Sequence, residues 1–343
     1  MSFVVRVGIL HSLTGTMAIS EAPLVEAALM AIDEINQTGG VLGQTIEAIV
    51  TDGASDPAQF AYNARKLIEC DRVNTLFGCW TSTSRKAVLP ALEEFNAQLW
   101  YPIQYEGLES AKNIFYTGPC PNQQIEPAIT WLLNNKGKRF YLLGSDDVFP
   151  RTANKLIKAQ LKHQNGIVLG EDYVPLEATE FTDIINRIHK LNPDVVFNTL
   201  NGDSNIAFYH QYQASGITAE EIPIMAVSVA EAELQKIGEA ATGHYACWNY
   251  FQSLDTSSNQ QFIQHFKARY GSNRVTSAPI EAAYTQVYLW KQAVELAASF
   301  DVEQVRVAAY GQTFDAPSGF VRIEPNHHVW KTCRIGQILP TGQ

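Results

Sequence analysis

Strands and helices alternate regularly along this chain, and this alternation constrains its fold more than any other feature. Apolar, β-branched runs such as Val4–Leu10 and Asp194–Thr199 have the length and composition of buried strands. Between such runs, apolar residues recur at helical spacing, as in Glu21–Ile35. Strands that alternate with helices build a parallel sheet covered by helices on both faces. The sequence therefore predicts an α/β fold.

The alternation is interrupted once, and this break divides the chain into two blocks. Pro119 and Pro121 lie in the segment Pro119–Gln124, where neither a helix interior nor a central strand would accept them. We interpret this segment as a crossover, after which a second α/β layer begins. A length of 343 residues is also long enough for two domains.

Near the end of the chain, Gly319–Ile323 and Val329–Ile335 are predicted to pair as a hairpin. The turn between them contains His327 and His328, which we interpret as solvated turn residues. Five cysteines are too few and too scattered for a disulfide scaffold. Cys70 and Cys79 are close enough in sequence to form a bridge, and we leave this option open.

Charge and motifs exclude several classes of function. A net charge of −10 and a pI of about 5.3 argue against nucleic acid and anionic membrane partners. The sequence contains no run of 18 apolar residues, so it predicts no membrane helix. Because Met1–Arg6 leads directly into a strand, we expect either a cytosolic protein or one whose export signal has been removed. Motifs for nucleophilic hydrolases, phosphate loops, dinucleotides and zinc peptidases are absent, so we expect no enzyme, no cofactor and no metal site.

The most informative stretch is Gly78–Gly107, in which two polar loops each follow a predicted strand. Four hydroxyl residues follow Trp80, and the second loop runs from Tyr101 to Glu106. The carboxyl ends of parallel strands meet at one sheet edge, where ligands bind in open α/β folds. Hydroxyls beside aromatic walls suit a small, neutral, polar molecule.

Polar loops also follow strands of the second block, at Ser145–Pro150, Asn201–Ser204 and Val227–Glu231. Helix capping is the alternative explanation for several of these side chains and for the first loop, namely for Ser82, Asp147, Asp203 and Ser204. For Asp147 this alternative is weaker, because a helix that begins at Pro150 would place the cap at Phe149. Trp80 has an alternative role as a core aromatic residue.

Three segments carry a resemblance to a known family: residues 78–107 (GCWTSTSRKAVLPALEEFNAQLWYPIQYEG), 119–128 (PCPNQQIEPA) and 144–154 (GSDDVFPRTAN). With residues 7–57, they resemble the branched-chain amino acid and amide receptors of the periplasmic binding proteins, and most closely their urea-binding branch. The resemblance implies a two-lobed type I periplasmic binding protein fold, in which a hinge joins two parallel sheets flanked by helices. The lobes would be residues 1–120 plus 253–328 and residues 121–252 plus 329–343.

The same resemblance implies a function. Such a receptor captures urea, or a close short-chain amide, between closing lobes and delivers it to the permease of an ABC transporter. It would be periplasmic, with a lipid anchor on the full-length precursor as a further option. It would insert no segment of this chain into the membrane and would bind no nucleic acid. The alternatives are a cytoplasmic amide-sensing regulator and a branched-chain amino acid receptor.

The resemblance also assigns ligand contacts in both lobes. In the first lobe they are Trp80, Thr81, Ser82, Tyr101, Ile103, Gln104 and Tyr105, and in the second lobe they are Asp147, Phe149, Asn201, Asp203 and Ser228. The amide-sensing regulator has tyrosines at the positions of Trp80, Asp147 and Phe149, which weighs against that function here. We expect the Asp147 carboxylate to accept two parallel N–H bonds of urea.

The remaining contacts would complete the site around urea. We expect backbone N–H groups and the hydroxyls of Thr81 and Ser82 to donate to its carbonyl. The rings of Trp80, Tyr101 and Tyr105 would flank the flat molecule and exclude water.

Overall fold

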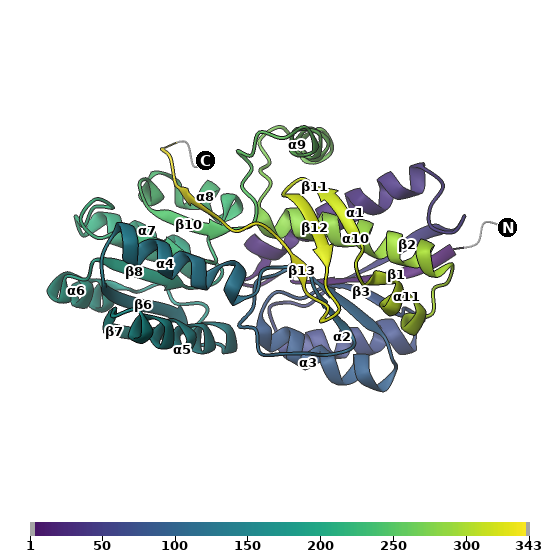
Figure 1. Ribbon diagram of the computed structural model, residues 1–343, viewed down its shortest axis with the longest axis horizontal. Helices are drawn as coiled ribbons and strands as arrows, with labels where there is room; N and C mark the ends of the chain where they lie inside the picture. Colours follow the sequence, from purple (N-terminus) through teal and green to yellow (C-terminus); the bar gives the residue numbers. More distant parts are fainter. Residues whose placement is uncertain (1–3, 341–343) are drawn as a thin grey trace.

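A computed structural model describes residues 4–340 and shows two lobes side by side along the long axis of the molecule (Figure 1). The first lobe contains a parallel sheet of five strands in the order β2-β1-β3-β4-β5. Its strands are β1 (Val4–His11), β2 (Thr45–Asp52), β3 (Thr75–Gly78), β4 (Gln98–Tyr101) and β5 (Ile114–Tyr116).

The second lobe contains a six-stranded sheet in the order β14-β10-β9-β8-β6-β7. Only β14 runs antiparallel to its neighbour in this sheet. The strands are β6 (Arg139–Ser145), β7 (Ile167–Val174), β8 (Val195–Thr199), β9 (Ile224–Ala226), β10 (Tyr245–Trp248) and β14 (Arg334–Gln337). The predicted α/β class and the two-lobed fold are confirmed.

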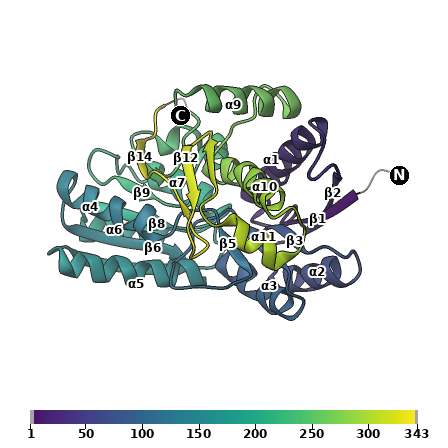
Figure 2. The same cartoon turned by 45° about the vertical axis from the view of Figure 1, so that its right-hand side comes forward.

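Helices cover both faces of each sheet. The helices associated with the first sheet are α1 (Ala18–Gln37), α2 (Pro57–Glu69), α3 (Ser82–Glu94), α9 (Ser257–Tyr270), α10 (Ala278–Ala297) and α11 (Val302–Ala309). Figure 2 shows α10 and α11 on one side of β1 and β3, and α2 and α3 on the other. Those of the second lobe are α4 (Ile125–Asn135), α5 (Val148–His163), α6 (Thr182–Leu191), α7 (Ser204–Ala214) and α8 (Glu231–Ile237).

The apolar faces of these helices bury the side chains of the strands. On one face of the first sheet, Val7 and Ile9 of β1 pack with Trp290 of α10. On the other face, Leu76 of β3 packs in a cluster with α2 and α3. Helices thus cover both faces of the central strands. A strand that is covered on both faces needs apolar side chains on both, which explains the continuous apolar runs in the sequence.

The chain passes between the lobes three times: after β5, after β10, and between the short strand β13 and β14 (Figure 1). β11 (Thr313–Ala316), β12 (Gly319–Ile323) and β13 (Val329–Trp330) form a separate antiparallel sheet. The predicted hairpin is correct for Val329–Trp330 but wrong beyond Trp330. Lys331 turns inward and pairs with the buried Glu281 at 3.3 Å, and β14 then joins β10 in the other lobe.

The interpretation of His327 and His328 as solvated turn residues is wrong. His327 is buried, and its ring stacks on Phe115 with a centroid distance of 4.7 Å. His328 stacks on Tyr116 at 4.6 Å and contacts the hydroxyl of Tyr105. The two histidines therefore attach the segment before the third crossing to β5 of the first sheet.

Cys70 and Cys79 do not form a bridge: Cys70 is exposed, Cys79 is buried, and both are free. Instead, the sulfur atoms of Cys247 and Cys333 lie 3.5 Å apart, beside the third crossing, and both are also free thiols.

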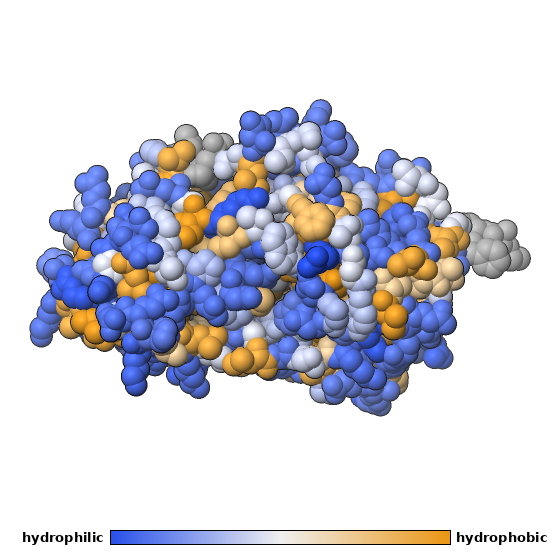
Figure 3. Space-filling model, viewed as in Figure 1, coloured by the Kyte–Doolittle hydropathy of each residue, from blue (hydrophilic) through white to orange (hydrophobic). Residues whose placement is uncertain are grey.

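Within residues 4–340, no helix is both long enough and apolar enough to cross a membrane. The face shown in Figure 3 is mainly hydrophilic, and its apolar side chains are scattered in small groups.

Candidate ligand-binding site

A small cavity lies between the two lobes, at the carboxyl ends of strands from both sheets. The first lobe lines it with Trp80, Thr81, Ser82, Ile103 and Gln104, and the second lobe with Asp147, Phe149 and Asn201. Its volume is only about 10 Å³. Sites for drug-sized ligands usually have about 300–1,000 Å³. In this closed form the cavity has room for about one water molecule, so a larger ligand requires the lobes to separate.

A close approach of two backbones places the first-lobe loop. A Cβ atom at Gly78, the last residue of β3, would lie 2.1 Å from the carbonyl oxygen of Leu10 in β1. Only glycine fits there. The chain turns sharply at the next residue, Cys79, which has a φ of +66°. The turn brings Trp80 and the start of α3 to the cavity.

Ser82, Thr83 and Ser84 form the first turn of α3, whereas the sequence predicted a loop. Thr81 is the N-cap, and its hydroxyl oxygen accepts a 3.0 Å bond from the Ser84 N–H. The capping role considered for Ser82 thus belongs to Thr81. This leaves the Ser82 side chain for contacts at the cavity.

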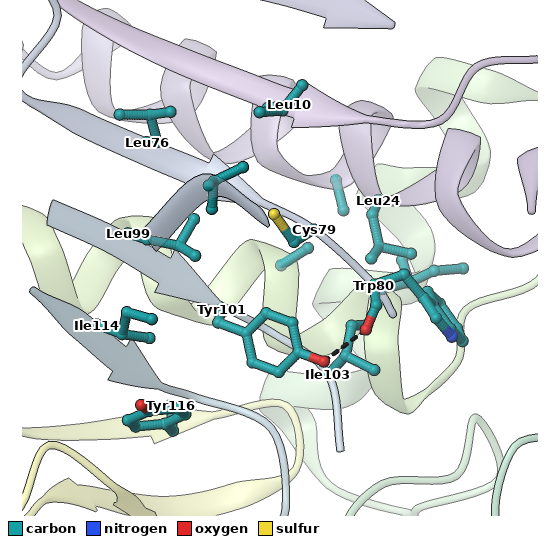
Figure 4. Close-up of a cluster of buried hydrophobic side chains, with 14 of the residues drawn as sticks. Leu10, Leu24, Leu76, Cys79, Trp80, Leu99, Tyr101, Ile103, Ile114 and Tyr116 are labelled. Carbon is teal, nitrogen blue, oxygen red and sulfur yellow. Dashed lines mark hydrogen bonds between the residues drawn. The ribbon is translucent and has the colours of Figure 1, made fainter. Parts of the chain in front are cut away.

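Tyr101 and Tyr105 do not line this cavity; they lie beneath it. The Tyr101 hydroxyl donates a 2.5 Å bond to the carbonyl oxygen of Trp80 (Figure 4). Burial raises the pKa of Tyr101 far above its usual value. Tyr105 is buried and stacks on Tyr116 with a centroid distance of 4.7 Å. The two tyrosines lie beneath the loop and do not flank the ligand as expected. The aromatic residues that line the cavity are Trp80 and Phe149.

A buried charged cluster below the cavity was missed by the sequence analysis. The guanidinium group of Arg85 is 4.8 Å from the ring centroids of both Tyr101 and Tyr105. It donates to Glu106 at 3.2 Å and to Glu109 at 3.0 and 3.1 Å. Burial opposes ionisation of Glu109, but the bond from Arg85 outweighs it and lowers the pKa of Glu109 to about 2. The only signal in the sequence was Arg85 one helical turn after Ser82.

In the second lobe, Asp147 is both the N-cap of α5 and part of the cavity lining. Its carboxylate accepts a 2.7 Å bond from the Val148 N–H and contacts the Thr83 hydroxyl of the first lobe. The prediction that this helix begins at Pro150 is wrong, because Val148 is already helical. Phe149 is therefore in the first turn and is not the cap, and its ring is buried beside the cavity.

Direct hydrogen bonds between the lobes close the cavity. Trp80 Nε1 donates to Asn201 Oδ1 at 3.4 Å, and Gln104 Nε2 donates to Ser228 Oγ at 3.2 Å. Ser228 therefore lies behind Gln104, outside the lining itself. Asp203 is exposed at the start of α7, where its side chain makes no capping bond, and it does not line the cavity. The structure is thus a closed form of the two lobes.

The polar character of the lining limits what it can bind. No lysine or arginine lines the cavity, and Asp147 is its only charged side chain. Across residues 4–340, no group of three or more His, Cys, Asp or Glu side chains is placed to hold a metal ion. The arrangement suits a small, neutral ligand held by hydrogen bonds between two lobes.

Comparisons with known proteins agree with this architecture. The profile of the periplasmic binding protein domain matches residues 5–343. The chain is 23% identical to the Leu/Ile/Val-binding protein homolog 6 of Brucella melitensis, over 98% of this chain and 87% of that protein. A shorter match, 41% identical over 103 residues, relates 30% of this chain to 19% of the limonene hydroxylase of Geobacillus stearothermophilus. The chain thus spans about a fifth of that enzyme's length.

Two solved structures share the fold over almost the whole chain. A solute-binding protein of an ABC transporter from Rhodopseudomonas palustris, in complex with 3,4-dihydroxybenzoic acid, superposes with a TM-score of 0.90. It is 20% identical, over 97% of this chain and 93% of that one. A branched-chain amino acid transporter substrate-binding protein from Streptococcus pneumoniae, in complex with isoleucine, has a TM-score of 0.89. It is 18% identical, over 99% and 97% of the two chains.

Proposed function

This chain belongs to the periplasmic binding protein family, whose members are solute receptors without enzymatic activity, and we propose that it binds urea or a close short-chain amide for an ABC transporter. In this proposal the two lobes close around the ligand, and the permease receives it from the closed form. The proposal includes a periplasmic location and lobes that comprise residues 1–120 plus 253–328 and residues 121–252 plus 329–343.

The size and chemistry of the closed cavity carry this proposal. The lobes are joined by direct hydrogen bonds around a cavity of only about 10 Å³. The separation that a ligand requires increases with its size, and urea is smaller than any amino acid. An amino acid with a branched side chain would therefore require a larger separation across the Trp80–Asn201 contact than urea.

The lining also fits the polarity of urea. Urea carries two NH₂ groups and one carbonyl, so it is mainly a hydrogen-bond donor. Asp147 supplies a carboxylate as acceptor, and Trp80 and Phe149 supply apolar faces for a flat molecule. No cationic side chain is present to pair with the carboxylate of an amino acid or an aromatic acid.

A branched-chain amino acid receptor is the second candidate, and the named relatives favour it. The Brucella relative is described as Leu/Ile/Val-binding, and the Streptococcus structure contains isoleucine. The N-terminus of α3, with the Thr81 hydroxyl, offers donors that can hold a carboxylate without a cation.

Titration calorimetry with urea, acetamide and leucine distinguishes the two candidates. The proposal predicts that urea releases heat with one-to-one stoichiometry and that leucine does not bind. Tight binding of leucine with no heat from urea would overturn the urea assignment and establish the second candidate.

A further inference from the structure

We infer that Arg85 and Glu106 hold the Ser82 hydroxyl as a hydrogen-bond acceptor toward the ligand, so that the closed site selects small molecules with N–H groups at two ends. This inference rests on the proposed function and deepens it, since it assigns the feature that separates urea from other small amides. It also revises two expectations, that Ser82 donates to the urea carbonyl and that Asp147 accepts an N–H from both NH₂ groups of urea.

The hydrogen bonds of Ser82 determine its polarity. Its O–H donates to Glu106 Oε2 at 2.5 Å, and its oxygen accepts a bond from an Arg85 NH group at 3.1 Å. A hydroxyl has one proton and two lone pairs. The proton and one lone pair are therefore used below the cavity, and one lone pair remains for a ligand.

Neither neighbour of Ser82 can reverse its role. A guanidinium has no acceptor, and a carboxylate paired with a guanidinium has no donor. Glu106 is held in place because its other oxygen accepts from Arg85 at 3.2 Å. The side chains of Arg85 and Glu106 are 0% and 6% exposed, so water cannot replace either partner.

The two lobes thus present acceptors to the same cavity. Ser82 contributes a lone pair from the first lobe, and Asp147 contributes a carboxylate from the second. Because these acceptors come from opposite lobes, a bound molecule must donate an N–H to each of them from a different end. Urea has an NH₂ group on each side of its carbonyl, whereas acetamide has only one. The carboxylate of leucine would bring an acceptor to Ser82, which has no proton to offer.

In this arrangement the urea carbonyl faces other donors of the first lobe. The Thr81 hydroxyl oxygen accepts the capping bond from Ser84, but its proton has no partner in the described structure. Thr81 lines the cavity, so this proton is available to the carbonyl. Thr81 and Ser82 therefore have opposite roles although they are adjacent hydroxyl residues.

Glu106→Gln tests the inference because it is isosteric and reverses the polarity of Ser82. The carbonyl of the new amide must face the Arg85 donor, which turns its NH₂ group toward Ser82. Both lone pairs of Ser82 are then occupied, and its proton points to the cavity. Glu109→Gln is the matched control, because Glu109 also binds Arg85 but does not contact Ser82.

Calorimetry measures the affinities of both variants for urea and for acetamide. We expect Glu106→Gln to weaken urea binding at least about tenfold, and acetamide binding by less than about threefold. Glu109→Gln should leave the affinity for urea within about threefold of the original protein. Ser82→Ala, which removes the acceptor without reversing it, should weaken urea binding by about as much as Glu106→Gln.

The outcomes separate the inference from the proposed function. Urea binding that is equal in Glu106→Gln and Glu109→Gln overturns the inference and leaves the proposed function standing. Equal weakening of urea and acetamide also overturns it, because this would show that Glu106 has only a structural role. Failure of the original protein to bind urea overturns the proposed function, and the inference with it. Circular dichroism confirms that each variant is folded before titration.

Discussion

The hydroxyl of Ser20 donates a 2.6 Å hydrogen bond to Glu233 Oε1, and this bond joins α1 of the first lobe to α8 of the second. Both residues are buried, with 2% of each exposed. The other oxygen of Glu233 accepts a 3.0 Å bond from the Ala230 N–H within its own lobe. Because the partners come from different lobes, the bond exists only when the lobes are closed.

Ser20→Ala should therefore shift the equilibrium toward the open form. Loss of one buried hydrogen bond corresponds to about 1 kcal/mol, which lowers ligand affinity by roughly fivefold through the population of the closed form. Calorimetry measures the affinity, and small-angle scattering measures the radius of gyration, which should increase without ligand. Glu233→Gln keeps a hydrogen-bonding group opposite Ser20 and should have the smaller effect. Unchanged affinity and radius in Ser20→Ala would rule out this closing role.

Asp147→Asn separates ligand binding from helix capping. Asparagine caps a helix nearly as well as aspartate, so the free energy of unfolding should stay within about 0.5 kcal/mol. A charged hydrogen bond contributes about 1.5–3 kcal/mol, so urea affinity should fall roughly tenfold to a hundredfold. Asp147→Ala should lose the same affinity and also about 1 kcal/mol of stability through the lost cap. Equal urea affinity in Asp147→Asn and the original protein would show that the carboxylate does not bind the ligand.

Gly78→Ala should destabilise the first lobe. Its Cβ would lie 2.1 Å from the backbone oxygen of Leu10, which cannot move without disrupting β1. Overpacking of this kind costs about 1–3 kcal/mol. Gly8→Ala is the control, because its nearest neighbour is a side-chain atom of Leu67 at 3.0 Å, which can rotate away. Unfolding should be followed in guanidinium chloride, since urea is the proposed ligand, and equal midpoints for the two variants would contradict this account.

Sequence patterns predicted the fold because most strands of the two large sheets are almost fully buried, such as β3, β4, β6 and β8. The run Val4–Leu10 is apolar except for Arg6, and the strand β1 (Val4–His11) matches that range closely. The exact helix starts were less predictable. Several hydroxyl residues in a row can each act as a cap, and only the tertiary structure selects Thr81 for α3.

The candidate site was predictable only in part. Trp80, Ser82 and Asp147 do line the cavity between the lobes, as the loop positions suggested. The Arg85–Glu106 pair could not be predicted, because its partners are 21 residues apart and meet only after β4 is placed. The burial of Tyr101 and Tyr105 has the same origin, since the sequence does not say that Arg85 lies against their rings.

Glu231, next to the second crossing, should make stability depend on pH. Burial raises its pKa to about 7 from an ordinary value of 4.5, and one of its carboxylate oxygens has no hydrogen-bond partner. Between these two pH values, the folded protein holds a proton that the unfolded chain has released. The free energy of unfolding should therefore decrease as pH rises from 4.5 to 7 and then level off.

Glu231→Gln removes this dependence. Relative to the original protein, the variant should gain up to about 3 kcal/mol between pH 4.5 and pH 8, measured in guanidinium chloride. Burial lowers the pKa of His244 to about 4, which reduces stability in acid, but this affects both proteins equally. Parallel pH profiles for the two proteins would contradict the assignment to Glu231.

A crystal structure with urea tests the central claim most directly, because it examines the ligand and its place together. The account predicts one urea molecule in the cavity between the lobes, with one NH₂ group at the Asp147 carboxylate and the other at Ser82 Oγ. Its plane should lie against Trp80 or Phe149. A cavity that remains without urea, or a co-purified amino acid held at Thr81 and Ser82, would contradict the account.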